Sequence, residues 1–159
     1  MGLLDIHGLS TRLASEAGWV HALDDISLAI EKGQTFALVG ESGCGKSMTA
    51  LSIARLLPDS GAIVAGQVKL SEGIAGTEGT DVLRISETAM RTLRGKRIAM
   101  IFQEPGTSLN PVMTVGDQLT EIICLHTGAA KAQALKVAEE WLARVGIPEP
   151  AQRLQQYPF

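Results

Sequence analysis

Three features are scarce in this sequence: cysteine, an excess of basic charge, and long apolar runs. Its two cysteines, Cys44 and Cys124, are too few for a disulfide framework. Acidic and basic residues are interleaved and the formal net charge is −3, which argues against a nucleic-acid surface or a polybasic membrane arm. No apolar run approaches the roughly 20 residues that span a bilayer, and the first residues lack a secretion signal. These absences predict a cytoplasmic location.

What the sequence does contain suits one folded domain. Its 159 residues are 45% apolar, enough for a hydrophobic core, and they show no internal repeat. Apolar runs and turn residues predict strands at residues 3–6, 22–30, 36–39, 63–70 and 97–102. Helices are expected at residues 48–57, 86–93, 114–126 and 131–145, and an exposed glycine-rich loop at 71–81. We therefore expect an α/β fold.

One motif is complete. Residues 40–47 read Gly-Glu-Ser-Gly-Cys-Gly-Lys-Ser, the phosphate-binding loop pattern G-x-x-x-x-G-K-[ST]. A strand-like run precedes it and a helix-like run follows it, which is the setting that such a loop requires. The motif predicts binding of the phosphates of a nucleotide. The alternative is a glycine-rich turn that carries Lys-Ser by chance, and the flanking strand and helix disfavour it.

Each residue type in this loop has a chemical reason. Gly43 and Gly45 permit backbone angles and a close approach that side chains would block, so that successive N–H groups form an anion-binding nest. The following helix adds its positive dipole end. Lys46 supplies a full charge at the β- and γ-phosphates, and the Ser47 hydroxyl is expected to bind Mg²⁺. The predicted nucleotide-binding residues are Gly40, Ser42, Gly43, Cys44, Gly45, Lys46, Ser47 and Met48, with Lys46 also catalytic.

A second segment carries a family resemblance. Residues 101–105 read Ile-Phe-Gln-Glu-Pro at the end of a predicted strand, and residues 107–111 read Thr-Ser-Leu-Asn-Pro. With residues 39–47 and 94–100, they resemble the ATPase subunits of ATP-binding-cassette (ABC) transporters, in particular the dipeptide, oligopeptide, nickel and glutathione importers. The resemblance extends over essentially the whole chain. It implies a partial ABC domain, with an antiparallel β subdomain and P-loop NTPase core over residues 1–113 and the beginning of a helical subdomain over 114–159.

The resemblance also implies roles outside the loop. Gln103, in the family's Q-loop, would contact Mg²⁺ and the attacking water and sense the γ-phosphate, because a neutral amide can accept from water and coordinate a cation. Taken alone, Gln103 would be better interpreted as a polar residue that ends a strand. Together with the phosphate loop and the flanking pattern, the functional role is favoured by analogy. The family stacks adenine on an aromatic residue upstream of the loop. Spacing points to Ala17, which cannot stack, so Trp19 is the candidate, with partial surface cover as the equal alternative.

Three family elements are expected after Phe159. The signature segment, the acidic strand that ends in a glutamate, and the switch histidine do not occur in residues 1–159. Only runs 36–39 and 98–102 look like strands buried on both faces, which is fewer than an α/β sheet usually has. Both observations favour a truncated cassette.

The resemblance implies a function for the full-length relative. It would be an ABC-type ATPase that binds ATP and Mg²⁺, pairs with a second ATPase subunit as a homo- or heterodimer, and drives permease subunits through the Q-loop and the helical surface. The imported solute would be a peptide, nickel or glutathione, delivered by a periplasmic or extracellular solute-binding protein. The location would be the cytoplasmic face of the inner (plasma) membrane, and nucleic acid is not an expected partner.

The chain itself is expected to bind nucleotide without efficient hydrolysis. Phosphoryl transfer needs the loop, a second metal-binding carboxylate and a positioned water, and only the loop is found. One alternative is a non-hydrolysing binding or assembly module. Another is a small-molecule kinase with Arg91, Arg94 and Arg97 as its lid, whereas a GTPase would carry an Asn-Lys-x-Asp motif that this sequence lacks.

Overall fold

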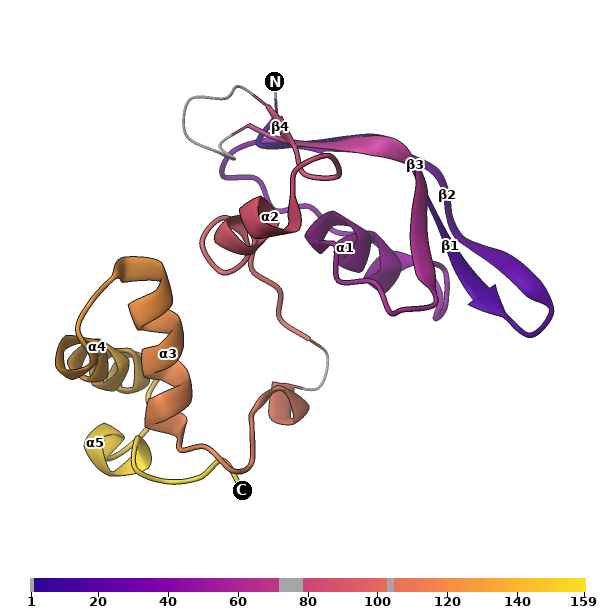
Figure 1. Cartoon of the computed structure of the whole chain (residues 1–159). Coiled ribbons are helices and arrows are strands. Elements are labelled where there is room, and N and C mark those ends of the chain that lie inside the picture. The colour runs from indigo at the N-terminus through magenta and orange to yellow at the C-terminus, as the bar shows by residue number, and fades with distance from the viewer. Residues whose placement is uncertain (1, 72–78, 103–104) are drawn as a thin grey trace. The chain divides into compact units, whose positions relative to one another are not determined.

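The chain forms two compact units, Met1–Met100 and Ile101–Phe159, in the computed structural model (Figure 1). The structure describes residues 2–71, 79–102 and 105–159. Most of the expected glycine-rich loop at 71–81, and Gln103 of the expected Q-loop, lie outside these ranges. The first unit contains the sheet and the phosphate-loop motif, and the second is helical.

A four-stranded antiparallel sheet with the order β2–β1–β3–β4 dominates the first unit. β1 (Leu4–Ser15) and β2 (Gly18–Ile30) form a long hairpin, whose tip extends past β3 in Figure 1. β3 (Gly61–Leu70) pairs with the other edge of β1, and β4 (Thr80–Asp81) adds two residues at the end of β3. The antiparallel β subdomain expected from the family resemblance is therefore present.

The core of the first unit lies on one face of this sheet. Ile6, Leu9 and Val68 are at most 1% exposed and belong to one buried cluster. Ile6 and Leu9 are three positions apart, and an irregularity in the pairing of β1 lies between them. Two residues of α2 (Glu87–Leu93), Met90 and Leu93, belong to the same buried cluster. The expected cap of α2 is confirmed, since the Ser86 hydroxyl accepts from the N–H of Ala89 at 3.2 Å.

The helix that follows the phosphate-loop motif, α1 (Lys46–Ala54), is attached to the sheet by a buried hydrogen bond. The hydroxyls of Thr11 in β1 and Ser52 in α1 lie 2.9 Å apart, and both residues are fully buried. α1 starts and ends earlier than the expected 48–57. It ends because Arg55 adopts the left-handed conformation (φ +52) and the N–H of Leu56 turns back to the carbonyl of Leu51 at 2.8 Å.

Two strand predictions are wrong. Residues 36–39 carry no helix or strand, and of residues 97–102 only Ile98 forms an isolated bridge, to Arg94. The side chains of Val39 and Ile101 are 94% and 91% exposed. A strand needs a hydrogen-bonded neighbour, and no strand within the described ranges pairs with either run. Apolar composition alone therefore did not determine the local structure.

The second unit consists of a short 3₁₀ turn (Pro105–Ser108) and the helices α3 (Val115–Thr127), α4 (Lys131–Arg144) and α5 (Pro150–Arg153). The expected start of α3 is confirmed, since the Thr114 hydroxyl accepts from the N–H of Asp117 at 3.1 Å. An ion pair of 2.9 Å between Asp117 and Lys131 links α3 to α4. None of the helices in the described ranges is long and apolar enough to cross a membrane.

Removing the buried hydroxyl of Thr11 should destabilise the first unit. Thr11→Val leaves the Ser52 hydroxyl without its partner, which should lower the free energy of unfolding by about 1–3 kcal/mol in a urea titration. Ser15→Ala removes an exposed hydroxyl of the same strand and should cost less than about 0.5 kcal/mol. An additive Thr11→Val/Ser52→Ala double variant would contradict the bond, because removing both partners should cost less than the sum.

The stability of the first unit should depend on Glu87 in acid. A hydrogen bond from Arg94, aided by the charges of Arg94, Arg55 and Arg91, holds the pKa of this carboxylate below its ordinary value of 4.5. A lowered folded-state pKa adds stability above the unfolded-state pKa, and this stability is lost as the pH falls through the folded-state pKa.

Glu87→Gln should therefore destabilise the protein at pH 7, and the difference from the unsubstituted chain should shrink when the pH falls below about 4.5. Urea titrations at pH 7 and in mild acid measure this difference. Thr88→Ala on the same helix is the control, and its effect should not change with pH. An equal effect of Glu87→Gln at both pH values would contradict the ion pair.

Candidate functional site

The phosphate-loop motif follows β2 in the chain and leads into α1, and its Gly45 lies against β2. Gly45, the N-cap of α1, has φ +94, and a Cβ added there would lie 2.7 Å from the carbonyl oxygen of Ala22 and 3.0 Å from Cδ2 of Leu23. Only glycine combines this backbone angle with such a close approach. β2 therefore fixes the point from which the helix begins.

The other two glycines of the loop meet different requirements. Gly43 has φ +82 and faces open space, so it is needed for its backbone angle alone. A Cβ at Gly40 would lie 2.5 Å from Sγ of Cys44, so this position needs a small residue. The backbone of the loop thus passes close to the Cys44 side chain. This agrees with the expectation that glycine is needed in the loop for its backbone angles and for close approach.

The N-terminal end of α1 is arranged to receive an anion. Gly45 has no side chain with which to cap the helix, and no acidic residue lies in the first turn. The first N–H groups of an α-helix have no acceptor within the helix, so those of α1 remain available to a ligand. Together with the helix dipole, they favour a phosphate group at this end.

Lys46 places its charge inside the loop. Its ammonium donates to the carbonyl oxygens of Gly40 at 2.7 Å and Glu41 at 2.5 Å, and it lies 3.4 Å from Sγ of Cys44. These contacts hold the ammonium against the loop backbone that leads into α1, whose first residue is Lys46. The neighbouring hydroxyl of Ser47 is exposed. Mg²⁺ usually takes one or two protein ligands together with substrate phosphates, and this hydroxyl fits that pattern.

The remaining predicted residues are more dispersed. Ser42 and Cys44 are exposed within the loop, whereas Met48 packs against the core, so that it offers a ligand only its backbone. Trp19 lies in β2 and is 58% exposed, and the guanidinium of Arg12 lies over its ring at 5.6 Å from the centroid. Gln103 is outside the described residues. The structure therefore brings together the loop residues only.

The sequence did not predict the contacts that β1 and β2 make with the loop and its helix. Ala22 and Leu23, predicted only as strand positions, lie against Gly45. Thr11, which lies outside the predicted strands, bonds to Ser52. Nothing in their residue types marks them. The available signal was the pair of hydroxyl residues Thr49 and Ser52, three positions apart on the predicted helix, and the structure buries both.

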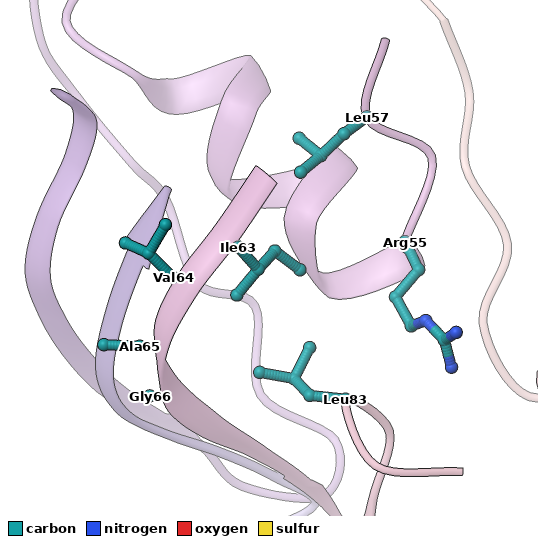
Figure 2. Close-up of a pocket in the computed structure, with 7 residues that line it drawn as sticks. All are labelled: Arg55, Leu57, Ile63, Val64, Ala65, Gly66 and Leu83. Carbon is teal, nitrogen blue, oxygen red and sulfur yellow. The ribbon is translucent and has the colours of Figure 1, made fainter. Parts of the chain in front are cut away.

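An open groove of about 410 Å³ lies at the other end of α1 (Figure 2). Its wall combines the end of the helix with β3 and the segment after β4, and its lining residues are Arg55, Leu57, Ile63, Val64, Ala65, Gly66 and Leu83. No residue of the phosphate loop is among them. The presence of a groove therefore does not locate the candidate site, and the loop chemistry does.

The loop, the uncapped helix and the lysine define a P-loop nucleotide-binding protein. A family model described as ABC transporter matches residues 23–158. The chain therefore belongs to the ABC transporter family.

Several curated proteins are similar over nearly the whole chain. A putative peptide import ATP-binding protein of Brucella abortus is 48% identical over 157 residues, which cover 98% of this chain and 46% of that protein. The dipeptide transport ATP-binding protein DppD of Bacillus subtilis is 44% identical, with 98% and 45% covered. The glutathione import ATP-binding protein GsiA of Salmonella typhimurium is 45% identical, with 98% and 25% covered. The chain thus spans less than half the length of these relatives.

Solved structures confirm the fold. A dimeric ATP-binding cassette in a post-hydrolysis state, bound to ADP and Pi, superposes with a TM-score of 0.76 at 19% identity, covering 98% of this chain and 61% of that one. A dimeric bacterial ABC transporter cassette gives 0.75 at 19% identity, with 97% and 60% covered. The expected ABC ATPase fold is therefore confirmed.

The glycine positions predict unequal costs for alanine. Gly43→Ala should lower the free energy of unfolding by about 1–2 kcal/mol, the usual cost of a left-handed non-glycine residue, because the site is otherwise open. Gly45→Ala should cost more, because the new Cβ would also collide with the backbone of β2. Urea titrations of the two variants measure this difference, and equal costs would contradict the contact between the loop and β2.

Proposed function

We propose that the chain binds Mg-ATP at the phosphate loop and is the ATP-binding part of an importer of peptides or a related small solute, such as glutathione or nickel. The observation that carries this proposal is the Lys46 ammonium beside the uncapped N-terminal end of α1. The names of the peptide, dipeptide and glutathione relatives support the choice of solute.

The residues have distinct roles in this proposal. The loop N–H groups and Lys46 would hold the phosphates, and Ser47 would bind Mg²⁺. When bound, Mg²⁺ neutralises the charge that develops on the transferred phosphoryl group. By resemblance, Gln103 would sense the γ-phosphate and contact the metal. We also propose that Trp19 contacts the adenine. Its side chain is exposed, so a nucleotide can reach it.

The proposed partners follow from the family. A second ATPase subunit would complete the nucleotide site, and permease subunits would bind the Q-loop and the helices of residues 114–159, with residues 1–113 forming the nucleotide-binding part. A solute-binding protein would act through the permeases. The proposed location is the cytoplasmic face of the plasma membrane, and the dimeric cassettes with the same fold support pairing.

We further propose that the 159-residue chain binds nucleotide without efficient hydrolysis. The acidic strand ending in a glutamate that the family resemblance would supply does not occur in residues 1–159. The loop would therefore act without the second carboxylate that phosphoryl transfer requires. A non-hydrolysing binding or assembly module is the second candidate, and the same observation favours it.

Lys46→Ala should abolish most of the nucleotide affinity. Loss of the ammonium should weaken binding of a fluorescent ATP analogue with Mg²⁺ by about tenfold or more, equivalent to about 1.4 kcal/mol. A fluorescence titration measures the dissociation constant. The control is Lys136→Ala, which removes an exposed lysine of α4 and should leave the affinity unchanged.

Two outcomes would contradict the proposal. Equal affinity of the unsubstituted chain and Lys46→Ala would remove the loop as the site. Steady phosphate release at a rate typical of ABC ATPases, abolished by Lys46→Ala, would refute the expectation that this chain hydrolyses little.

A further inference from the structure

The helix that carries the loop has a buried face made of small and polar residues. Its fully buried positions are Thr49, Ser52 and Ala54, whereas Met48 and Ile53 reach the core only partly buried. Small and hydroxyl side chains bury little apolar area, so the hydrophobic effect contributes little to holding this helix in place. The orientation of α1 therefore depends on the hydrogen bonds made at specific points along it.

One of these points is the C-terminal end of the helix, where Arg94 binds two backbone carbonyls. Nε of Arg94 donates to the carbonyl of Ala54 at 2.8 Å, and Nη2 donates to that of Arg55 at 2.9 Å. The last carbonyls of a helix have no partner within it, and a cation there opposes the negative end of the dipole. α1 has no basic residue in its own last turn, so Arg94 supplies this charge from outside.

The guanidinium of Arg94 is itself fixed by the residues around it. Nη1 of Arg94 donates to Oε1 of Glu87 at 2.6 Å, and Oε2 of the same carboxylate lies 3.5 Å from Nη2 of Arg55. Arg55 also donates to the carbonyls of Val82 and Ile85, at 3.2 and 2.8 Å. Arg55 stands at the end of α1 in Figure 2. All three nitrogens of the Arg94 guanidinium therefore donate a hydrogen bond, and the side chain is only 21% exposed.

We propose that Arg94 is a positioning residue for the phosphate loop and sets its affinity for nucleotide through α1. The helix has nine residues, or about 13 Å at 1.5 Å per residue, and it carries Lys46 and Ser47 at its opposite end. A change of tilt at the Arg94 end therefore displaces the N–H groups and the ammonium that receive the phosphates. This inference rests on the proposed binding of nucleotide to the loop.

The test compares two arginines of one ion-pair cluster. Arg94→Gln removes both carbonyl bonds, and Arg94→Lys keeps the charge but loses the planar fork. Arg91→Gln is the matched control, because Arg91 also approaches Glu87, at 3.8 Å, but its side chain is 79% exposed. The probe is a fluorescent ATP analogue with Mg²⁺, and the dissociation constant is measured at a temperature where every variant is fully folded.

Arg94→Gln should weaken binding of the analogue by about fivefold, the equivalent of one charge-dipole interaction, and Arg94→Lys by less. Glu87→Gln, which releases the guanidinium, should weaken it by about two- to threefold. Arg91→Gln should leave it unchanged. If Arg94→Gln does not fold, Arg94→Lys and Glu87→Gln carry the test.

A merely structural role of Arg94 is distinguished by Ile6→Val. Ile6 is fully buried in β1, and its shortening lowers stability without removing a hydrogen bond between Arg94 and the end of α1. The positioning role is overturned if Ile6→Val loses as much affinity as the Arg94 variants. It is also overturned if the Arg94 variants bind the analogue normally. In both cases the proposed function stands. Failure of the unsubstituted chain to bind the analogue would instead overturn the proposed function.

Discussion

β1 is hydrogen-bonded to a neighbouring strand along both of its edges, and the phosphate-loop motif and α1 are attached to these three strands, β2, β1 and β3. β2 lies on one side and supplies the backbone against which Gly45 rests. β3 lies on the other side and pairs in turn with β4. From its buried face β1 itself extends the Thr11 hydroxyl to α1. The position of the loop is thus a consequence of strand pairing, although no residue of the loop belongs to a strand.

The helix that carries the loop combines two opposite electrostatic arrangements. Its N-terminal end is left without a cap or an acidic side chain, which keeps its N–H groups available for an anion. Its C-terminal end is saturated by the guanidinium of Arg94. An anion would therefore approach the free positive end of a helix dipole whose negative end is already compensated. The compensating charge, the Arg94 guanidinium, lies at the opposite end of α1 from the phosphate loop.

The features that could be predicted from sequence are those decided within a few residues. The caps at Ser86 and Thr114 and the loop motif all depend on neighbours within one turn, and the structure confirms the two caps. Strand prediction at residues 36–39 failed because a strand is defined by its partner, which local composition does not specify. The same reason explains why Arg94 was noted only as one of three basic residues: its acceptors lie about 40 positions earlier in the chain.

The hydrogen bond between Thr11 and Ser52 joins residues 41 positions apart. Such a contact forms only after the intervening chain has been closed into a loop, a step that costs entropy before any contact compensates for it. That intervening chain includes β2, the phosphate-loop motif and the start of α1. The anchoring of α1 to β1 therefore depends on closure of the same segment that contains the phosphate-loop motif, so we expect the motif to reach its native position only together with that closure.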